Sequence, residues 1–149
     1  MNESVKSRYR PKNPAKYKGN PNNIICRSNW EKKFCQWCDT NESILLWASE
    51  EFSIPYRSPL DNRVHQYYPD FLIKVKEGNG SIRDYVIEVK PKRQCSPPKK
   101  KSKVTKGYIY ESKEYAKNQA KWEAAQEWCK DRRLIFKVIT EDELGIKYK

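Results

Sequence analysis

The segment YYPDFLIKVKEGNGSIRDYVIEVKPKR, residues 67–93, decides the fold. Apolar residues at Phe71, Ile73 and Val75 alternate with polar ones, which predicts a strand. The turn EGNGS (77–81), rich in Gly and Asn, predicts a hairpin, and the returning strand IRDYVIEVK ends at Pro91. Because side chains alternate across a strand, Glu88 and Lys90 should share one face. The hairpin should also make the strands of Asp70 and Glu88 adjacent.

The flanking sequence predicts a helix before this hairpin and a helix and strand after it. Ser28 is a helix-capping residue with Glu31 three positions later, as in a capping box, so we expect a helix over about 29–39. Residues 43–58 predict one strand with an irregular middle, and residues 64–76 a second strand. A further helix is expected over about 112–132, a strand within 133–142 and a short helix at 141–144. The order is a helix, an antiparallel meander, a helix and a strand.

The charge distribution indicates a polyanionic partner. The net charge is +12, and residues 1–24 carry six Lys/Arg and one acid, whereas residues 90–106 carry eight Lys/Arg and no acid. The remainder of the chain is therefore close to neutral. Pro11, Pro14 and Pro21 predict an extended basic arm over 1–24, followed by one domain over 25–149 with a basic loop at 91–107. Nucleic acid is the commonest partner of such a chain, although lysine-rich loops can also serve solubility alone.

Other features narrow the class of protein. No apolar run approaches the roughly 20 residues that span a bilayer, and residues 1–20 lack the apolar stretch of a signal peptide. We therefore expect a soluble protein of the cytoplasm with no membrane partner. Five cysteines, with a lone CxxC at Cys35 and Cys38, favour buried thiols over disulfides or a zinc site.

Two acids, Asp70 and Glu88, lie in predicted strands of a basic chain, and this placement favours a metal site. Asp70 and Glu88 can converge on one hard cation such as Mg²⁺ or Mn²⁺, which prefers carboxylate and carbonyl ligands. The carbonyl of Val89 is then a further ligand, Glu31 a candidate third carboxylate, and Lys90 can contact an attacking water or a phosphate. The alternative is that Asp70 and Glu88 are ordinary residues on the wet face of a one-sided sheet.

These residues carry a resemblance to a known superfamily. YPDF, followed by EVK, with the preceding helix SNWEKKF, resembles the PD-(D/E)xK nucleases, and most closely the head completion nucleases of T-even-like bacteriophages. AKWEAAQEWCKDRRLIFKVITEDEL (120–144) is similar to the region after the active site in TnsA-type endonucleases, which have Gln where this chain has Glu88. The resemblance implies an α/β (α+β) fold with an αβββαβ core, a mixed sheet flanked by helices. It also implies Mg²⁺-dependent DNA cleavage with Glu31, Asp70, Glu88 and Lys90 as active-site residues.

The same resemblance implies a role late in virion assembly. The partners would be double-stranded DNA, including branched or end structures, and capsid, portal or neck proteins, in the host cytoplasm or on the virion. We expect backbone contacts to DNA, without strong sequence preference, from two basic segments and one helix. The candidate residues are Arg8, Arg10, Lys92, Arg93, Lys99, Lys100, Lys101, Lys103, Gln119 and Lys121. His65 is a weaker candidate acid, base or phosphate contact.

Two other functions remain open at this point. One is a different nuclease of the superfamily, acting on transposon ends, mismatches or junctions. The other is a virion DNA-binding protein without catalysis, which would have no use for metal-ligand chemistry in one cleft.

Overall fold

The computed structural model describes residues 6–100 and 102–145. A four-stranded mixed sheet of order β3-β6-β7-β8 forms its centre. The sheet strands are β3 Ile44–Ser49, β6 Phe71–Lys76, β7 Ile82–Val89 and β8 Ile135–Ile139. The helices are α1 Asn29–Thr40, α2 Lys106–Asp131 and α3 Glu141–Leu144, with 3-10 turns η1 Pro14–Lys16 and η2 Lys92–Cys95. Two short antiparallel pairs, β1 Ser7–Tyr9 with β2 Ile24–Cys26 and β4 Ile54–Arg57 with β5 Val64–Tyr67, complete the fold.

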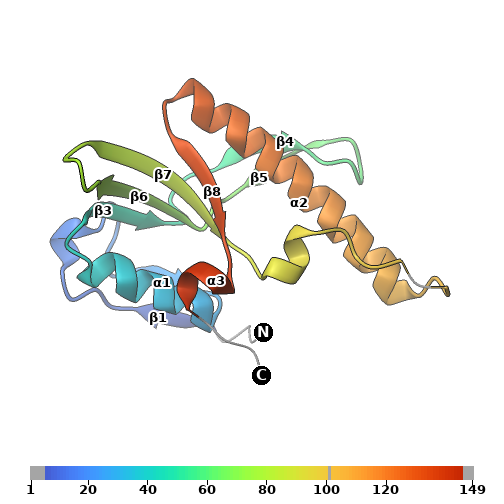
Figure 1. The fold of residues 1–149 in the computed structure, drawn as a ribbon, viewed down its shortest axis with the longest axis horizontal. Helices are drawn as coiled ribbons and strands as arrows, with labels where there is room; N and C mark the ends of the chain where they lie inside the picture. The colour runs from blue at the N-terminus through green and yellow to red at the C-terminus, as the bar shows by residue number, and fades with distance from the viewer. Residues whose placement is uncertain (1–5, 101, 146–149) are drawn as a thin grey trace.

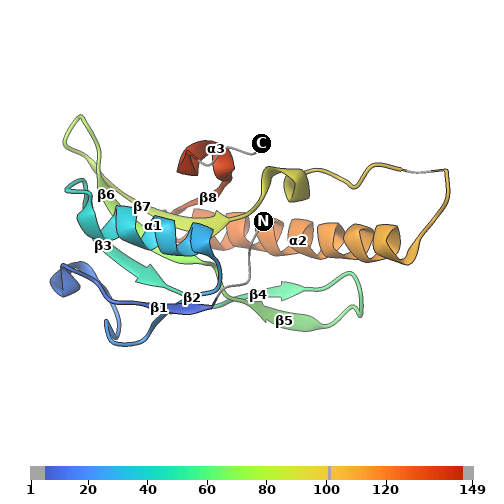
Figure 2. The same ribbon diagram turned by 90° about the horizontal axis from the view of Figure 1, so that it is seen from below.

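The sheet separates two apolar clusters, because both of its faces are covered by a helix (Figure 1). On one face, Phe34 of α1 packs against Phe71 of β6 with ring centroids 4.5 Å apart. On the other, Trp122 and Ala125 of α2 are buried against Phe136 and Val138 of β8 and the β4–β5 pair. Figures 1 and 2 both show β4 and β5 beside α2, beyond the end of the four-stranded sheet. The predicted mixed sheet flanked by helices is confirmed.

The predicted hairpin and its neighbours are present. β6 and β7 pair in antiparallel register with Phe71 opposite Ile87, and the turn closes through the Glu77 N–H to the Ser81 carbonyl at 2.8 Å. β7 and β8 are parallel, since α2 carries the chain back across the sheet. The helix expected over 29–39 and the strand and short helix expected after α2 are found at α1, β8 and α3.

Two expected strands are each divided in two. Residues 43–58 form β3 and β4, and residues 64–76 form β5 and β6, with β4 and β5 paired in a sheet of their own. Glu50 ends β3 in a left-handed backbone conformation with φ 52°, and Pro69 lies in the break before β6. The chain therefore leaves the central sheet after β3, forms the β4–β5 hairpin and re-enters at β6.

The second helix begins earlier than predicted, at Lys106 instead of near Ser112. Thr105 caps it, because its hydroxyl accepts from the Tyr108 N–H at 3.1 Å. The first turns of α2 extend beyond the sheet, where Ile109 and Tyr110 remain exposed. Sequence periodicity could not reveal these turns, since they have no buried face. Among the described helices, none is both long and apolar enough to cross a bilayer.

The N-terminal segment is packed against the domain, which differs from the extended arm predicted over 1–24. Asp39 of α1 is fully buried and accepts from the Tyr9 hydroxyl at 2.6 Å and from the Lys12 and Asn13 N–H groups at 2.7 and 2.9 Å. The ring of Tyr17 lies 4.7 Å from that of Trp47. These polar anchors are spread over the segment and have no periodicity. The first five residues of the predicted arm lie outside the described part of the chain.

Candidate active site

Strand register brings three acids into one row at an end of the central sheet. Extending the β6–β7 pairing by one residue places Asp70 opposite Glu88, and extending the β3–β6 pairing places Glu50 opposite Asp70. The Glu50 N–H donates to the Asp70 carbonyl at 3.1 Å, which continues the ladder. Directly opposed residues point to the same side of an antiparallel sheet. The pairing therefore explains why acids distant in sequence meet.

Glu31 joins this row from the first turn of α1. The Ser28 hydroxyl accepts from the Glu31 N–H at 3.1 Å and fixes the start of the helix, as predicted. The Glu31 carboxylate accepts from the Arg27 N–H at 3.1 Å, so only half of the expected capping box forms. One carboxylate oxygen from each of Glu31, Glu50 and Asp70 lies within 4.8 Å of the other two. Carboxylate oxygens at this spacing are suitable ligands for a hard divalent cation.

Burial and, after it, mutual repulsion raise the pKa values of two acids in this row. Burial, followed by the charges of Glu88 and Glu31, raises the pKa of Asp70 well above its ordinary value, despite a hydrogen bond from the Val89 N–H at 2.8 Å. Burial, and then Glu50 and Glu88, likewise raise the pKa of Glu31. A cation among these carboxylates would relieve both the repulsion and the cost of burial. The residues present therefore fit a divalent metal.

Glu88 and Lys90 lie on one face of β7, as the sequence predicted. Both Glu88 oxygens have a partner: the Tyr67 hydroxyl donates to Oε1 at 2.5 Å, and Lys90 Nζ lies 3.2 Å from Oε2. Burial lowers the pKa of Lys90, but the charges of Glu88 and Asp70 outweigh it and hold that pKa above its ordinary value. Lys90 is therefore a cation at neutral pH in the metal-free protein, suited to hold an anion or a water.

A cleft of about 540 Å³ opens over this row. Asp70, Glu88 and Glu50 line it from the sheet, and Lys121 lines it from α2. Lys121 Nζ lies over the rings of Tyr56 and Tyr67, at 5.9 and 5.6 Å from their centroids. Burial, and then the charge of Lys117, lower its pKa. The remaining lining residues are Arg27, Gln66, Tyr67 and Tyr68.

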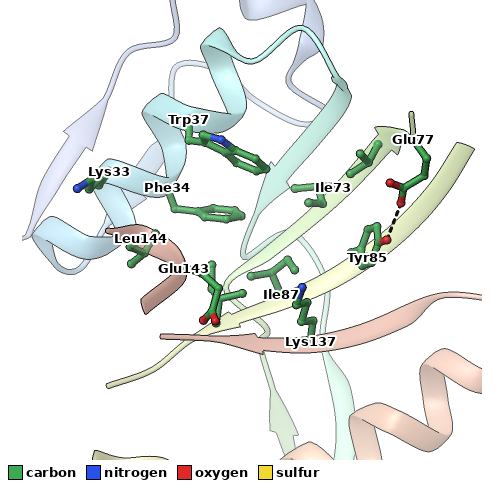
Figure 3. A pocket seen from close by; sticks show the side chains of 12 residues that line it. Lys33, Phe34, Trp37, Ile73, Glu77, Tyr85, Ile87, Lys137, Glu143 and Leu144 are labelled. Atoms are coloured by element: carbon green, nitrogen blue, oxygen red, sulfur yellow. Dashed lines mark hydrogen bonds between the residues drawn. The ribbon is translucent and has the colours of Figure 1, made fainter. Parts of the chain in front are cut away.

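A second cavity, of about 310 Å³, lies on the opposite side of the sheet between α1, the strands and α3 (Figure 3). Its walls are mostly apolar, with Phe34 and Trp37 facing Ile73 and Ile87 (Figure 3). The Glu77 carboxylate at its edge accepts from the Tyr85 hydroxyl at 2.6 Å. None of the four acids of the row lines this cavity, so the charged chemistry belongs to the cleft.

The structure brings some predicted residues together and leaves others apart. Glu31, Asp70, Glu88 and Lys90 converge, and Lys121 faces them. Gln119 is exposed and lies two residues from Lys121 on a helix, so the two cannot share a face. His65 Nε2 pairs with Asp61 at 2.8 Å on the β4–β5 hairpin and is absent from the cleft lining.

Apart from Lys121, the predicted basic residues that the structure describes lie outside the cleft lining. Arg8 and Arg10 are exposed at β1, and Arg93, Lys99, Lys100 and Lys103 are exposed between β7 and α2. Lys92 pairs with Asp142 of α3 at 3.1 Å. Lys101 lies outside the described residues.

Sequence reasoning missed Glu50 and Arg27. Glu50 lies in SEEFS, the irregular middle of the single strand predicted over 43–58, and a single strand does not reveal its position opposite Asp70. Arg27 directly precedes the helix cap and pairs with Glu50 through Nε at 3.1 Å. An acid at the end of the strand that pairs with the YPDF strand was the available signal for Glu50.

Comparison with known proteins agrees with this geometry. Residues 41–141 match the family described as "TnsA-like endonuclease N terminal", a range that contains Asp70, Glu88 and Lys90 but not Glu31. The chain is also 38% identical over 138 residues to the "Head completion nuclease" of Enterobacteria phage T4, across 90% of this chain and 89% of that protein. These findings confirm the PD-(D/E)xK-type relationship predicted from the sequence. The chain therefore belongs to the TnsA-like endonuclease family.

Proposed function

We propose that this protein is a divalent-metal-dependent DNA endonuclease that acts in bacteriophage head completion. The observation that carries the proposal is the convergence of Glu31, Glu50, Asp70 and Glu88 with Lys90 beside one cleft. The similarity to a head completion nuclease supports the phage role. The protein would act in the host cytoplasm, on double-stranded DNA at filled heads, with capsid, portal or neck proteins nearby.

Each residue has a role that follows from its position. Glu31, Glu50 and Asp70, whose carboxylate oxygens lie within 4.8 Å of one another, would hold Mg²⁺ or Mn²⁺, and Glu88 and the Val89 carbonyl would be further ligands, as the resemblance implies. When bound, such an ion supplies charge stabilisation and a more acidic water. Lys90, held as a cation beside Glu88, would orient the attacking water or contact the scissile phosphate. Tyr67 fixes Glu88 in place through its hydroxyl.

DNA would be held mainly by charge. Lys121 lines the cleft from α2, with its side-chain nitrogen over two tyrosine rings. The exposed lysines and arginines named above would contact phosphates outside the cleft, from the N-terminal segment and the loop before α2. Such contacts orient a duplex without reading its sequence.

A plasmid-nicking assay tests the proposal. The wild-type protein should nick supercoiled DNA in Mg²⁺ or Mn²⁺ and not in EDTA, whereas Asp70→Ala and Lys90→Met should lose nicking. Lys74→Met is the matched control, since Lys74 is a half-buried lysine of the same sheet that pairs with Asp84. Wild-type protein that cuts neither linear, branched nor single-stranded DNA with either ion would contradict the proposal. Salt-sensitive binding without cleavage would instead favour a non-catalytic virion DNA-binding protein.

A further inference from the structure

Arg27 occupies the mouth of the cleft, where nothing in the proposed mechanism uses it. It follows β2 directly and precedes the Ser28 cap of α1. Its side chain is 57% exposed, whereas that of its partner Glu50 is 22% exposed. The guanidinium group is therefore more open to solvent than the acid it pairs with, in a cleft that Asp70 and Glu88 also line.

The contact between Arg27 and Glu50 is one that a phosphate could replace. Arg27 Nε donates to both Glu50 oxygens, at 3.2 and 3.1 Å, and one terminal nitrogen donates to Oε1 at 3.1 Å. The fork of a guanidinium group matches a carboxylate and a phosphate equally well. Because exposed ion pairs contribute little to stability, exchange of one anion for the other costs little.

Glu50 also has a second use for its carboxylate. One of its oxygens lies within 4.8 Å of oxygens of Glu31 and Asp70, so the charge that holds Arg27 is the same charge that a cation in this row would take. The backbone of Arg27 is tied to the row as well, since its N–H donates to Glu31. A cation and Arg27 therefore compete for one carboxylate.

We infer that Arg27 is a DNA-phosphate-binding residue that Glu50 holds in the metal-free protein and releases when a divalent cation occupies the row. The inference rests on the proposed function and adds a residue and a coupling to it. Without the cation, the acids repel DNA and Arg27 is masked. With it, the repulsion falls and a guanidinium group becomes free in the cleft that Lys121 also lines, so metal binding and DNA binding reinforce each other.

Fluorescence anisotropy of a short labelled duplex, in Ca²⁺ or in EDTA, tests the coupling without relying on cleavage. Wild-type affinity should rise in Ca²⁺. Arg27→Gln should bind roughly tenfold more weakly than wild type in Ca²⁺, with the slope of log K against log salt reduced by about 0.9, the value for one lost phosphate contact. In EDTA the same substitution should change affinity less than about twofold, since Arg27 is then tied to Glu50.

Two further variants make the result specific. Arg83→Gln removes one exposed positive charge on β7, away from the Glu88 end of that strand, and should show no Ca²⁺-dependent loss. Glu50→Gln should bind DNA more tightly than wild type in EDTA, because Arg27 is released, and should gain less from Ca²⁺. Melting curves of each variant verify the fold.

The inference is overturned if Arg27→Gln and Arg83→Gln have the same DNA affinity in Ca²⁺. It is also overturned if Arg27→Gln loses as much DNA affinity in EDTA as it does in Ca²⁺. Either result leaves the proposed function intact where Asp70→Ala and Lys90→Met still abolish nicking. Failure of the wild-type protein to nick DNA under any condition would instead remove the proposed function, whatever the Arg27 result.

Discussion

Tyr67→Phe isolates the hydrogen bond that fixes Glu88. Tyr67 is buried, its ring packs in the cluster of Ile54 and Trp122, and its hydroxyl lies 2.5 Å from Glu88 Oε1. Phenylalanine keeps the ring and deletes the donor. A hydrogen bond to a charged group contributes about 1.5–3 kcal/mol, so the free energy of unfolding should fall by that amount. With an unfolding entropy of about 2.1 cal/mol/K per residue, the melting temperature should fall by roughly 5–10 °C.

Calorimetry in EDTA at neutral pH measures this difference. Tyr56→Phe is the control, because Tyr56 is buried in the same cluster and its hydroxyl has no hydrogen bond to any residue that the structure describes. Tyr56→Phe should lower the free energy of unfolding by less than roughly 0.5 kcal/mol. If Tyr67→Phe has the same melting temperature as Tyr56→Phe, the Tyr67 hydroxyl does not hold Glu88 and the argument is refuted.

The same substitution should weaken metal binding. Outer partners that orient a ligating side chain typically contribute 10–100-fold in metal affinity. Titration of Mn²⁺ by calorimetry should therefore give at least a roughly tenfold weaker Kd for Tyr67→Phe than for wild type. An unchanged Kd would show that Glu88 is oriented by Lys90 alone.

Three other perturbations follow from the structure. Ser28→Ala should cost about 1 kcal/mol of unfolding free energy by removing the α1 cap, and nicking should fall because Glu31 lies on that turn. Asp39→Ala should cost about 3 kcal/mol or more, since three buried or half-buried donors lose their acceptor, and a melt like that of wild type would contradict this. Asp70 has a pKa raised above its unfolded value, so the folded protein binds more protons from about pH 4 up to that pKa. Stability in EDTA should thus fall as pH rises through that window, and Asp70→Asn should flatten the profile and raise the neutral-pH melting temperature. A steeper profile, or a lower melting temperature, would count against the assignment.

The hairpin and the site residues on it could be predicted because local patterns specify them. Alternation fixed the faces of β6 and β7, and the Gly- and Asn-rich turn fixed their pairing, so the Glu88–Lys90 side of the site followed from periodicity alone. Glu31 followed from a helix cap. In each case the information lies within a few residues of the side chain concerned.

Glu50 and the buried N-terminal segment could not be predicted, because long-range contacts determine them. Glu50 joins the row only through the β3–β6 register, and no turn signal announces that pairing, since a whole hairpin intervenes. The segment around Tyr9 is fixed by a single buried acid, Asp39, through separate polar contacts without periodicity. Composition predicts a basic arm over residues 1–24 because the lysines and arginines of this segment outnumber its few buried residues.

The partners of the acids explain how the site folds without a cation and yet favours one. Each acid has a partner that stabilises its negative charge. Arg27 forms an ion pair with Glu50, the Val89 N–H donates to Asp70, and Tyr67 and Lys90 contact Glu88. Since the pKa values of Asp70 and Glu31 remain raised, these partners do not fully compensate for burial and repulsion. A cation at 100 times its Kd would add about 2.7 kcal/mol of stability. The residual repulsion is thus a source of metal affinity. Under the inference drawn above, a cation in the row would release Arg27 from Glu50 to bind DNA, while Tyr67 continues to hold Glu88.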